Sequence, residues 1–172
     1  MPKIENRLFF ILAVFMATVV AISNYLVQFP IKYFNLENLL TYGAFTYPIS
    51  FLITDLSNRK YGKKTAQKVV YFGFFCGVFT TFYFSMSNID LISIRIAFAS
   101  GIAFLTAQLI DINIFDKLRK KKWFIAPLTS SLVGSSIDTL LFFSIAFYGT
   151  GINWVTLSFG DLAVKILVAL IM

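Results

Sequence analysis

The sequence predicts an all-α, polytopic membrane protein: six transmembrane helices in one bundle, with the N and C termini in the cytoplasm. Its 172 residues are 58% hydrophobic and 13% charged, whereas soluble domains are about 45–50% apolar and about 25% charged. Its mean hydropathy is +0.79. Long apolar runs recur along the chain, and basic residues cluster in alternate connections between them.

Composition excludes several classes of protein. A water-facing globule of this length has too little polar surface to cover so many Phe, Ile, Leu and Val side chains. There is no histidine, and the lone Cys76 lies in an apolar run. Histidine-based catalysis, histidine metal sites, internal disulfides and thiolate clusters are therefore excluded. We expect no enzyme, no cofactor and no bound metal.

The single domain, residues 1–172, contains six apolar runs, at residues 8–27, 39–56, 69–86, 96–115, 123–148 and 152–172. The first has 20 residues without a charge, about the length that crosses a hydrocarbon core of about 30 Å. The second is interrupted by Gly43 and Pro48 and holds Asp55 near its end. A kink is expected at Pro48. The third has 18 uncharged residues.

The last three runs carry polar side chains within apolar sequence. These are Gln108, Asp111 and Asn113 in the fourth run, Asp138 in the fifth, and Asp161 and Lys165 in the sixth. The connections between runs are too short for a soluble domain, so the runs are expected to form one compact bundle.

Basic residues predict the orientation of this bundle. The N-terminal segment holds two, the second connection five and the fourth connection five, whereas the first and third connections hold one each, Lys32 and Arg95. Cytoplasmic loops of membrane proteins carry such an excess of Lys and Arg. A multi-pass membrane protein with both termini in the cytoplasm follows, and the basic residues are read as topological rather than as a nucleic-acid surface.

Carboxylates within the spans require an explanation, because a charge at the centre of a bilayer costs about 2.5–3.5 kcal/mol on insertion scales. Asp55 could be an interfacial residue facing Arg59, four residues on, or a functional one. Asp161 and Lys165 have the spacing of a neutralised structural pair. Asp111 and Asp138 lack an adjacent cation in the sequence, which favours a functional role. Gln108 lies one turn before Asp111 and is grouped with it.

Blocks of residues on several spans resemble the VUT family of queuosine precursor transporters, over about residues 45–168. The blocks are Tyr47–Arg59, Tyr61-Gly62, Val69-Val70, Arg95–Ala97, Ala103–Leu105, Gln108–Asp111, Ala126–Leu128, Ser131, Gly134-Ser135, Asp138-Thr139, Phe142-Phe143, Gly160-Asp161 and Lys165. Two features depart from the family pattern. Arg59 stands where many relatives have Glu, and the chain stops at Met172, as expected of a trimmed C-terminus or a short last helix.

The resemblance implies an inner-membrane importer of 7-deazaguanine bases, chiefly 7-cyano-7-deazaguanine and also its aminomethyl relative, for queuosine salvage in tRNA. It implies a small-molecule substrate and no ATPase module. The oligomeric state is left open, a homo-oligomer included.

The residues themselves suit such a base. A carboxylate can accept the ring N–H and the amino group of a deazaguanine together, an amide can serve its carbonyl, and aromatic faces can stack on it. The expected substrate-binding residues are Gln108, Asp111, Asp138, Phe104 and Ser135. The expected gate or coupling residues are Asp55, Asn58, Arg59, Asp161 and Lys165.

Two alternative functions and the mode of transport remain open. The chain could be the substrate-binding component of an energy-coupling-factor vitamin transporter, or a membrane scaffold whose carboxylates only fix helix packing. For a transporter, proton-coupled uptake and facilitated diffusion are both compatible with the residues.

Overall fold

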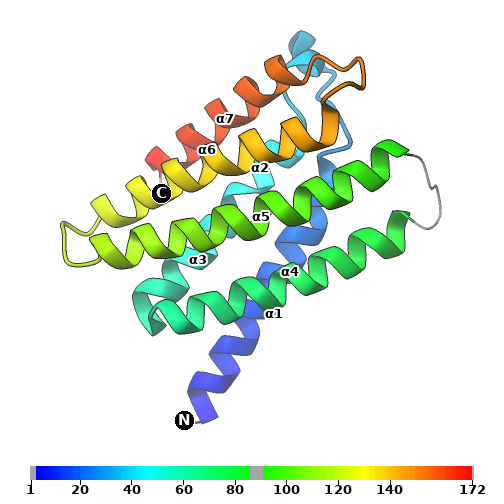
Figure 1. Ribbon diagram of the computed structural model, residues 1–172. Helices are drawn as coiled ribbons and strands as arrows, with labels where there is room; N and C mark the ends of the chain where they lie inside the picture. The colour runs from blue at the N-terminus through cyan, green and yellow to red at the C-terminus, as the bar shows by residue number, and fades with distance from the viewer. Residues whose placement is uncertain (1–2, 86–90, 172) are drawn as a thin grey trace.

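The computed structural model describes residues 3–85 and 91–171, and this part of the chain is all-helical (Figure 1). Its elements are α1 (Lys3–Leu26), the 3-10 helix η1 (Tyr33–Asn38), α2 (Gly43–Thr46), α3 (Pro48–Tyr61), α4 (Lys63–Ser85), α5 (Leu91–Leu118), α6 (Ile125–Phe147) and α7 (Trp154–Ile171). The predicted fold class is thereby confirmed at the level of helices. The expected run ends at Met86 and Met172 lie outside the described residues.

Within the described residues, four helices are long and apolar enough to cross a membrane. They are Arg7–Leu26 in α1, Ile94–Leu118 in α5, Ile125–Phe147 in α6 and Trp154–Ile171 in α7. Large aromatic side chains such as Phe10, Phe79 and Phe98 are 62%, 72% and 70% exposed, which suits a surface in contact with lipid. The chain is therefore a multi-pass membrane protein, while the count of six spans stays a prediction.

The kink expected at Pro48 takes the form of a break between α2 and α3. Pro48 is the first residue of α3, a position where its missing N–H removes no helical hydrogen bond. The hydroxyl of Ser50 donates to the Tyr47 carbonyl at 2.7 Å. At 14 residues, α3 alone is about 21 Å long, so only α2 and α3 together approach the thickness of a hydrocarbon core.

The basic connection expected after the second run is not an extended loop. Helix α3 continues to Tyr61 and α4 begins at Lys63, so Gly62 alone joins them, with a φ of +86° that favours glycine. Arg59 and Lys60 thus lie in the last turn of α3, where positive charge complements the helix dipole.

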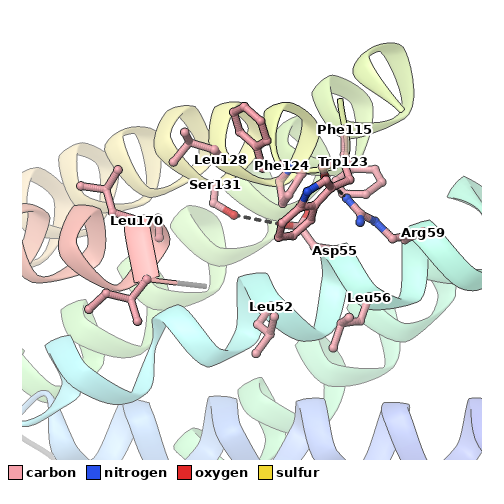
Figure 2. A pocket seen from close by; sticks show the side chains of 13 residues that line it. Leu52, Asp55, Leu56, Arg59, Phe115, Trp123, Phe124, Leu128, Ser131 and Leu170 are labelled. Carbon is pink, nitrogen blue, oxygen red and sulfur yellow. Dashed lines mark hydrogen bonds between the residues drawn. The ribbon is translucent and has the colours of Figure 1, made fainter. Parts of the chain in front are cut away.

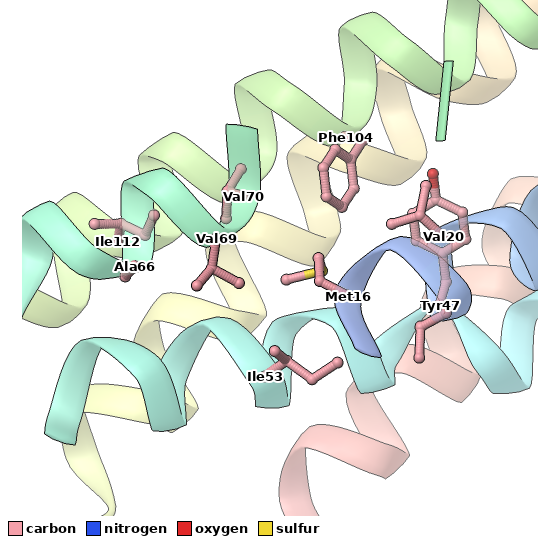
Figure 3. Close-up of a cluster of buried hydrophobic side chains, with 10 residues drawn as sticks. Met16, Val20, Tyr47, Ile53, Ala66, Val69, Val70, Phe104 and Ile112 are labelled. Carbon is pink, nitrogen blue, oxygen red and sulfur yellow. The ribbon is translucent and has the colours of Figure 1, made fainter. Parts of the chain in front are cut away.

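Close helix packing and two apolar clusters hold the bundle together. Helix α4 approaches α1 through Gly73, where a Cβ would lie 2.3 Å from Met16 Cγ. Next to this contact, a buried cluster joins α1, α3, α4 and α5 (Figure 3); it includes Met16, Ile53, Val69 and Phe104. A second cluster, centred on α5 and α6, includes Phe142, Phe143 and Phe147.

The basic segments gather at one end of the bundle. Figure 1 shows the N-terminus, the α3–α4 junction, the α5–α6 connection and the C-terminus at the same end. This arrangement agrees with the alternation of basic residues along the sequence. That this end faces the cytoplasm stays a prediction.

Candidate functional site

A cavity of about 410 Å³ opens at the basic end of the bundle, between α3, α6 and the end of α7 (Figure 2). Asp55, Arg59 and Ser131 are its polar residues. Its other lining residues are Leu52, Leu56, Phe115, Trp123, Phe124, Pro127, Leu128, Ala169, Leu170 and Ile171. Of the residues predicted to act, it brings together two expected gate residues and none of the five expected to bind substrate.

Asp55 forms the buried polar floor of this cavity. Its side chain comes from α3, and the residue is 5% exposed. Ser130 donates to Oδ1 at 3.3 Å and Ser131 donates to Oδ2 at 3.1 Å, both from α6. A carboxylate has about four acceptor positions, so these two hydroxyls leave acceptor capacity for a ligand.

Arg59 does not pair with Asp55, although the two are one helical turn apart. Its guanidinium donates to the carbonyl of Trp123 and lies over the Phe115 ring, 5.5 Å from the ring centroid. Trp123, 71% exposed, packs edge-to-face against Phe124. Asp55 and Arg59 therefore line the same cavity without forming an ion pair, and Arg59 belongs to an aromatic rim (Figure 2).

Asp111 lies next to Asp55 but does not line the cavity. It is fully buried on α5, and neither carboxylate oxygen has a hydrogen-bond partner among the described residues. Its interacting neighbours are the Asp55 carboxylate and the Ser130 hydroxyl. Gly134 of α6 faces it, because a Cβ there would lie 3.2 Å from the Asp111 Cβ.

Gln108 lies one turn before Asp111 on α5, and both of its polar atoms are occupied. Its Nε2 donates to Ser50 Oγ at 2.9 Å, and its Oε1 accepts from Thr54 Oγ1 at 2.5 Å. Both partners belong to α3, so the amide ties the two helices together. Phe104, another turn earlier, is 1% exposed and lies in the apolar cluster of α1, α3, α4 and α5.

Asp138, Asp161 and Lys165 form a buried charge cluster between α6 and α7. Lys165 Nζ lies 2.8 Å from Asp138 Oδ2 and 2.5 Å from Asp161 Oδ2. Thr139 donates to Asp161 Oδ2 at 2.7 Å, whereas Asp138 Oδ1 is buried without a partner among the described residues. The view that Asp138 lacks an adjacent cation is wrong, because α7 brings Lys165 to it. The pair of Asp161 with Lys165 forms as its spacing suggested.

The remaining predicted residues are buried away from the cavity. Asn58 donates through Nδ2 to the Ile112 carbonyl at 3.0 Å and accepts from Arg119 at 2.6 Å, which fixes α3 against α5. Ser135 is buried on α6, one turn before Asp138.

Several residues near the predicted ones were not predicted from the sequence, among them the rim residues Trp123 and Phe124, and also Ser130 and Tyr47. For Ser130, the sequence offered no indication of a role except its position next to Ser131. Tyr47 is buried, with its hydroxyl near Ser100 at 3.2 Å and its ring 5.2 Å from Lys165 Nζ. Its position next to Pro48, at the start of the recognised block, was the available sign.

Known proteins similar to this chain are named as transporters. The chain is 31% identical to the "Probable queuosine precursor transporter" of Haemophilus influenzae, over 98% of this chain and 84% of that protein. It is 30% identical to the "Queuosine precursor transporter" of Escherichia coli, over 94% of this chain and 81% of that protein. A protein of Bacillus subtilis, also named "Probable queuosine precursor transporter", is 27% identical over 63% of this chain and 57% of its own length.

No solved structure matches the chain. The family described as "Putative vitamin uptake transporter" matches residues 41–172, which include α2 to α7 and every residue that lines the described cavity. A match over most of the chain, together with relatives at about 30% identity over nearly all of it, shows the family. The chain therefore belongs to this family of vitamin uptake transporters.

Proposed function

We propose that the protein imports queuosine precursors across the bacterial inner membrane, with 7-cyano-7-deazaguanine as its principal substrate and 7-aminomethyl-7-deazaguanine as a second. The names of two relatives that align with most of the chain support the substrate class. The observation that carries the proposal for the site is a buried carboxylate, Asp55, at the floor of a cavity with an aromatic rim.

The chemistry of the base matches this cavity. A deazaguanine is flat and neutral and presents a ring N–H and an amino group on one edge. Asp55 can accept both in a bidentate arrangement, which makes such contacts specific. Trp123, which is 71% exposed, offers a ring face for stacking. A cavity of about 410 Å³ lies within the range of small-molecule sites, about 300–1,000 Å³.

In this proposal the cavity is the cytoplasmic half of the transport path. Its place at the basic end of the bundle supports that orientation. The inner half of the path would lie among the other predicted residues, where Asp111 and Asp138 have carboxylate oxygens without hydrogen-bond partners among the described residues. Gln108, Phe104 and Ser135 would line it beside them. Asn58, Asp161 and Lys165 would hold the helices that separate the two halves.

Complementation tests this function. A strain unable to make the precursor, expressing the chain, is supplied with each base, and queuosine in its tRNA is measured. We expect both bases to restore queuosine, with the cyano base effective at the lower concentration. If neither base restores queuosine although the protein is in the membrane, the proposed function is wrong.

The same strain tests the site. Asp55→Asn, Asp111→Ala and Asp138→Ala should each reduce queuosine to background while the protein still inserts. Asp116→Asn is the matched control, because Asp116 is partly exposed, away from the cavity and paired with Arg119 at 3.4 Å. Full activity of Asp55→Asn would remove the cavity from the substrate path.

A further inference from the structure

We infer that Asp111 is a positioning residue that holds a proton, so that the adjacent Asp55 is the single anion facing the cavity. In this arrangement the Asp111 hydroxyl donates to the Asp55 carboxylate and orients it toward the ligand. The part that concerns transport rests on the proposed function, whereas the protonation state of Asp111 can be measured without any substrate.

Burial and hydrogen bonding distinguish the two carboxyl groups. Asp55 accepts from two serine hydroxyls and borders the cavity. Asp111 is fully buried, and both of its oxygens lack hydrogen-bond partners among the described residues. An ionised carboxylate in such a place is strongly disfavoured, whereas a neutral carboxyl is tolerated. A protonated Asp111 also has an O–H to donate, and Asp55 is the neighbour able to accept it.

Among the described residues, no cation forms an ion pair with either carboxyl group within 4 Å. On α3 the charged neighbour of Asp55 is Arg59, which is engaged with Trp123 and Phe115 and forms no ion pair with it within 4 Å. Helix α6 contributes the hydroxyls of Ser130 and Ser131. Helix α4 packs here through Ala66, Val69 and Val70, and α7 borders the cavity through Ala169, Leu170 and Ile171, all of them apolar. Two adjacent carboxylates in this setting cannot both be ionised at neutral pH.

The charge cluster of α7 does not serve this pair. Lys165 is engaged by Asp138 and Asp161, at 2.8 and 2.5 Å. The lysine therefore neutralises a separate group of carboxylates. In the Asp55–Asp111 pair, the proton on Asp111 keeps the total charge at one negative charge.

Infrared spectroscopy of the purified full-length protein at neutral pH tests the protonation state without a substrate. We expect the C=O stretching band of a protonated carboxyl in the wild type, its loss in Asp111→Asn, and its persistence in Asp138→Asn and in Asp116→Asn. Absence of the band from the wild type, or its loss in Asp138→Asn rather than in Asp111→Asn, overturns the inference.

Uptake by proteoliposomes tests the positioning role. An asparagine has the shape of the protonated acid and keeps a donor, so Asp111→Asn should restore much of the uptake of 7-cyano-7-deazaguanine that Asp111→Ala loses at neutral pH.

The outcomes separate the two proposals. If Asp111→Asn inserts in the membrane but is as inactive as Asp111→Ala, Asp111 must ionise during the cycle and the inference is wrong. If the wild type transports neither base, the proposed function fails, while the infrared result still decides whether Asp111 holds the proton.

Discussion

At the scale of single residues, the four buried aspartates differ in what compensates them. Asp138 and Asp161 share Lys165, Asp55 has two serine hydroxyls, and Asp111 has no hydrogen-bond donor among the described residues. Burial of a charge is tolerated according to its partners. The same residue type therefore has a structural role beside Lys165 and a proposed substrate-binding role beside the cavity.

Removal of the buried lysine should cost far more stability than removal of one of its partners. Lys165→Met leaves two carboxylates without a cation, for which we expect a loss of about 3–5 kcal/mol in the free energy of unfolding. Asp138→Asn leaves the ion pair of Lys165 with Asp161, so its loss should be clearly smaller. Thermal unfolding in detergent measures both.

Lys120→Met is the control for this pair of variants, because Lys120 is an exposed basic residue at the end of the bundle. It should unfold at the wild-type temperature. A Lys165→Met protein as stable as the Lys120→Met protein would contradict the structural role of the cluster.

At the scale of elements, the bounds of the helices and the close contacts between them could not be predicted from hydrophobicity alone. Apolar length alone predicts a single second span over residues 39–56, but Pro48 starts a new helix and Gly62 turns the chain directly into α4. The position of Pro48 could be read from the sequence. The continuation of α3 through the basic residues could not, because charged residues at a membrane boundary suit a helix and a loop alike.

Helix α7 should be sensitive to any side chain at Gly160. A Cβ there would lie 1.9 Å from the backbone oxygen of Leu39 and 2.8 Å from its carbonyl carbon. Gly160→Ala must therefore displace α7 from the segment that precedes α2. We expect a loss of about 1–3 kcal/mol in the free energy of unfolding, measured by thermal unfolding.

Gly101→Ala is the matched control in α5, because a Cβ there meets its nearest neighbours at 3.4 and 3.6 Å, which is ordinary contact. Alanine is also the better helix former by about 1 kcal/mol. Gly101→Ala should be neutral or stabilising. Equal stability of the two alanine variants would show that α7 does not depend on this close approach.

At the scale of the whole molecule, the gathering of basic residues at one end predicts the orientation in the membrane. Lys121 lies in the α5–α6 connection at that end, and Asn153 lies beside the start of α7 at the other. In a Cys76→Ser background, Asn153→Cys should react with a membrane-impermeant maleimide added to spheroplasts. Lys121→Cys should react only after permeabilisation, and the reverse pattern would place the cavity on the outer face.

The family resemblance and the all-helical, membrane-embedded class could be predicted from composition, apolar runs and motif blocks, which depend on neighbours along the chain. The site could be predicted only in part. Asp55 and Arg59 were singled out, but their grouping with Ser131 and Phe115 brings residues from α3, α5 and α6 together.

Hydrophobicity, helical spacing and the basic residues between spans act locally, so the class of the molecule can be predicted from the sequence. Which polar groups meet depends on the packing of the helices. Lys165 reaches Asp138 across 27 residues, and Ser131 reaches Asp55 across 76 residues. Such contacts depend on which faces of the helices pack together. This packing is why Asp138 has a cation, why Asp111 is buried beside Asp55 without a cation paired to it among the described residues, and why the cavity opens above Asp55.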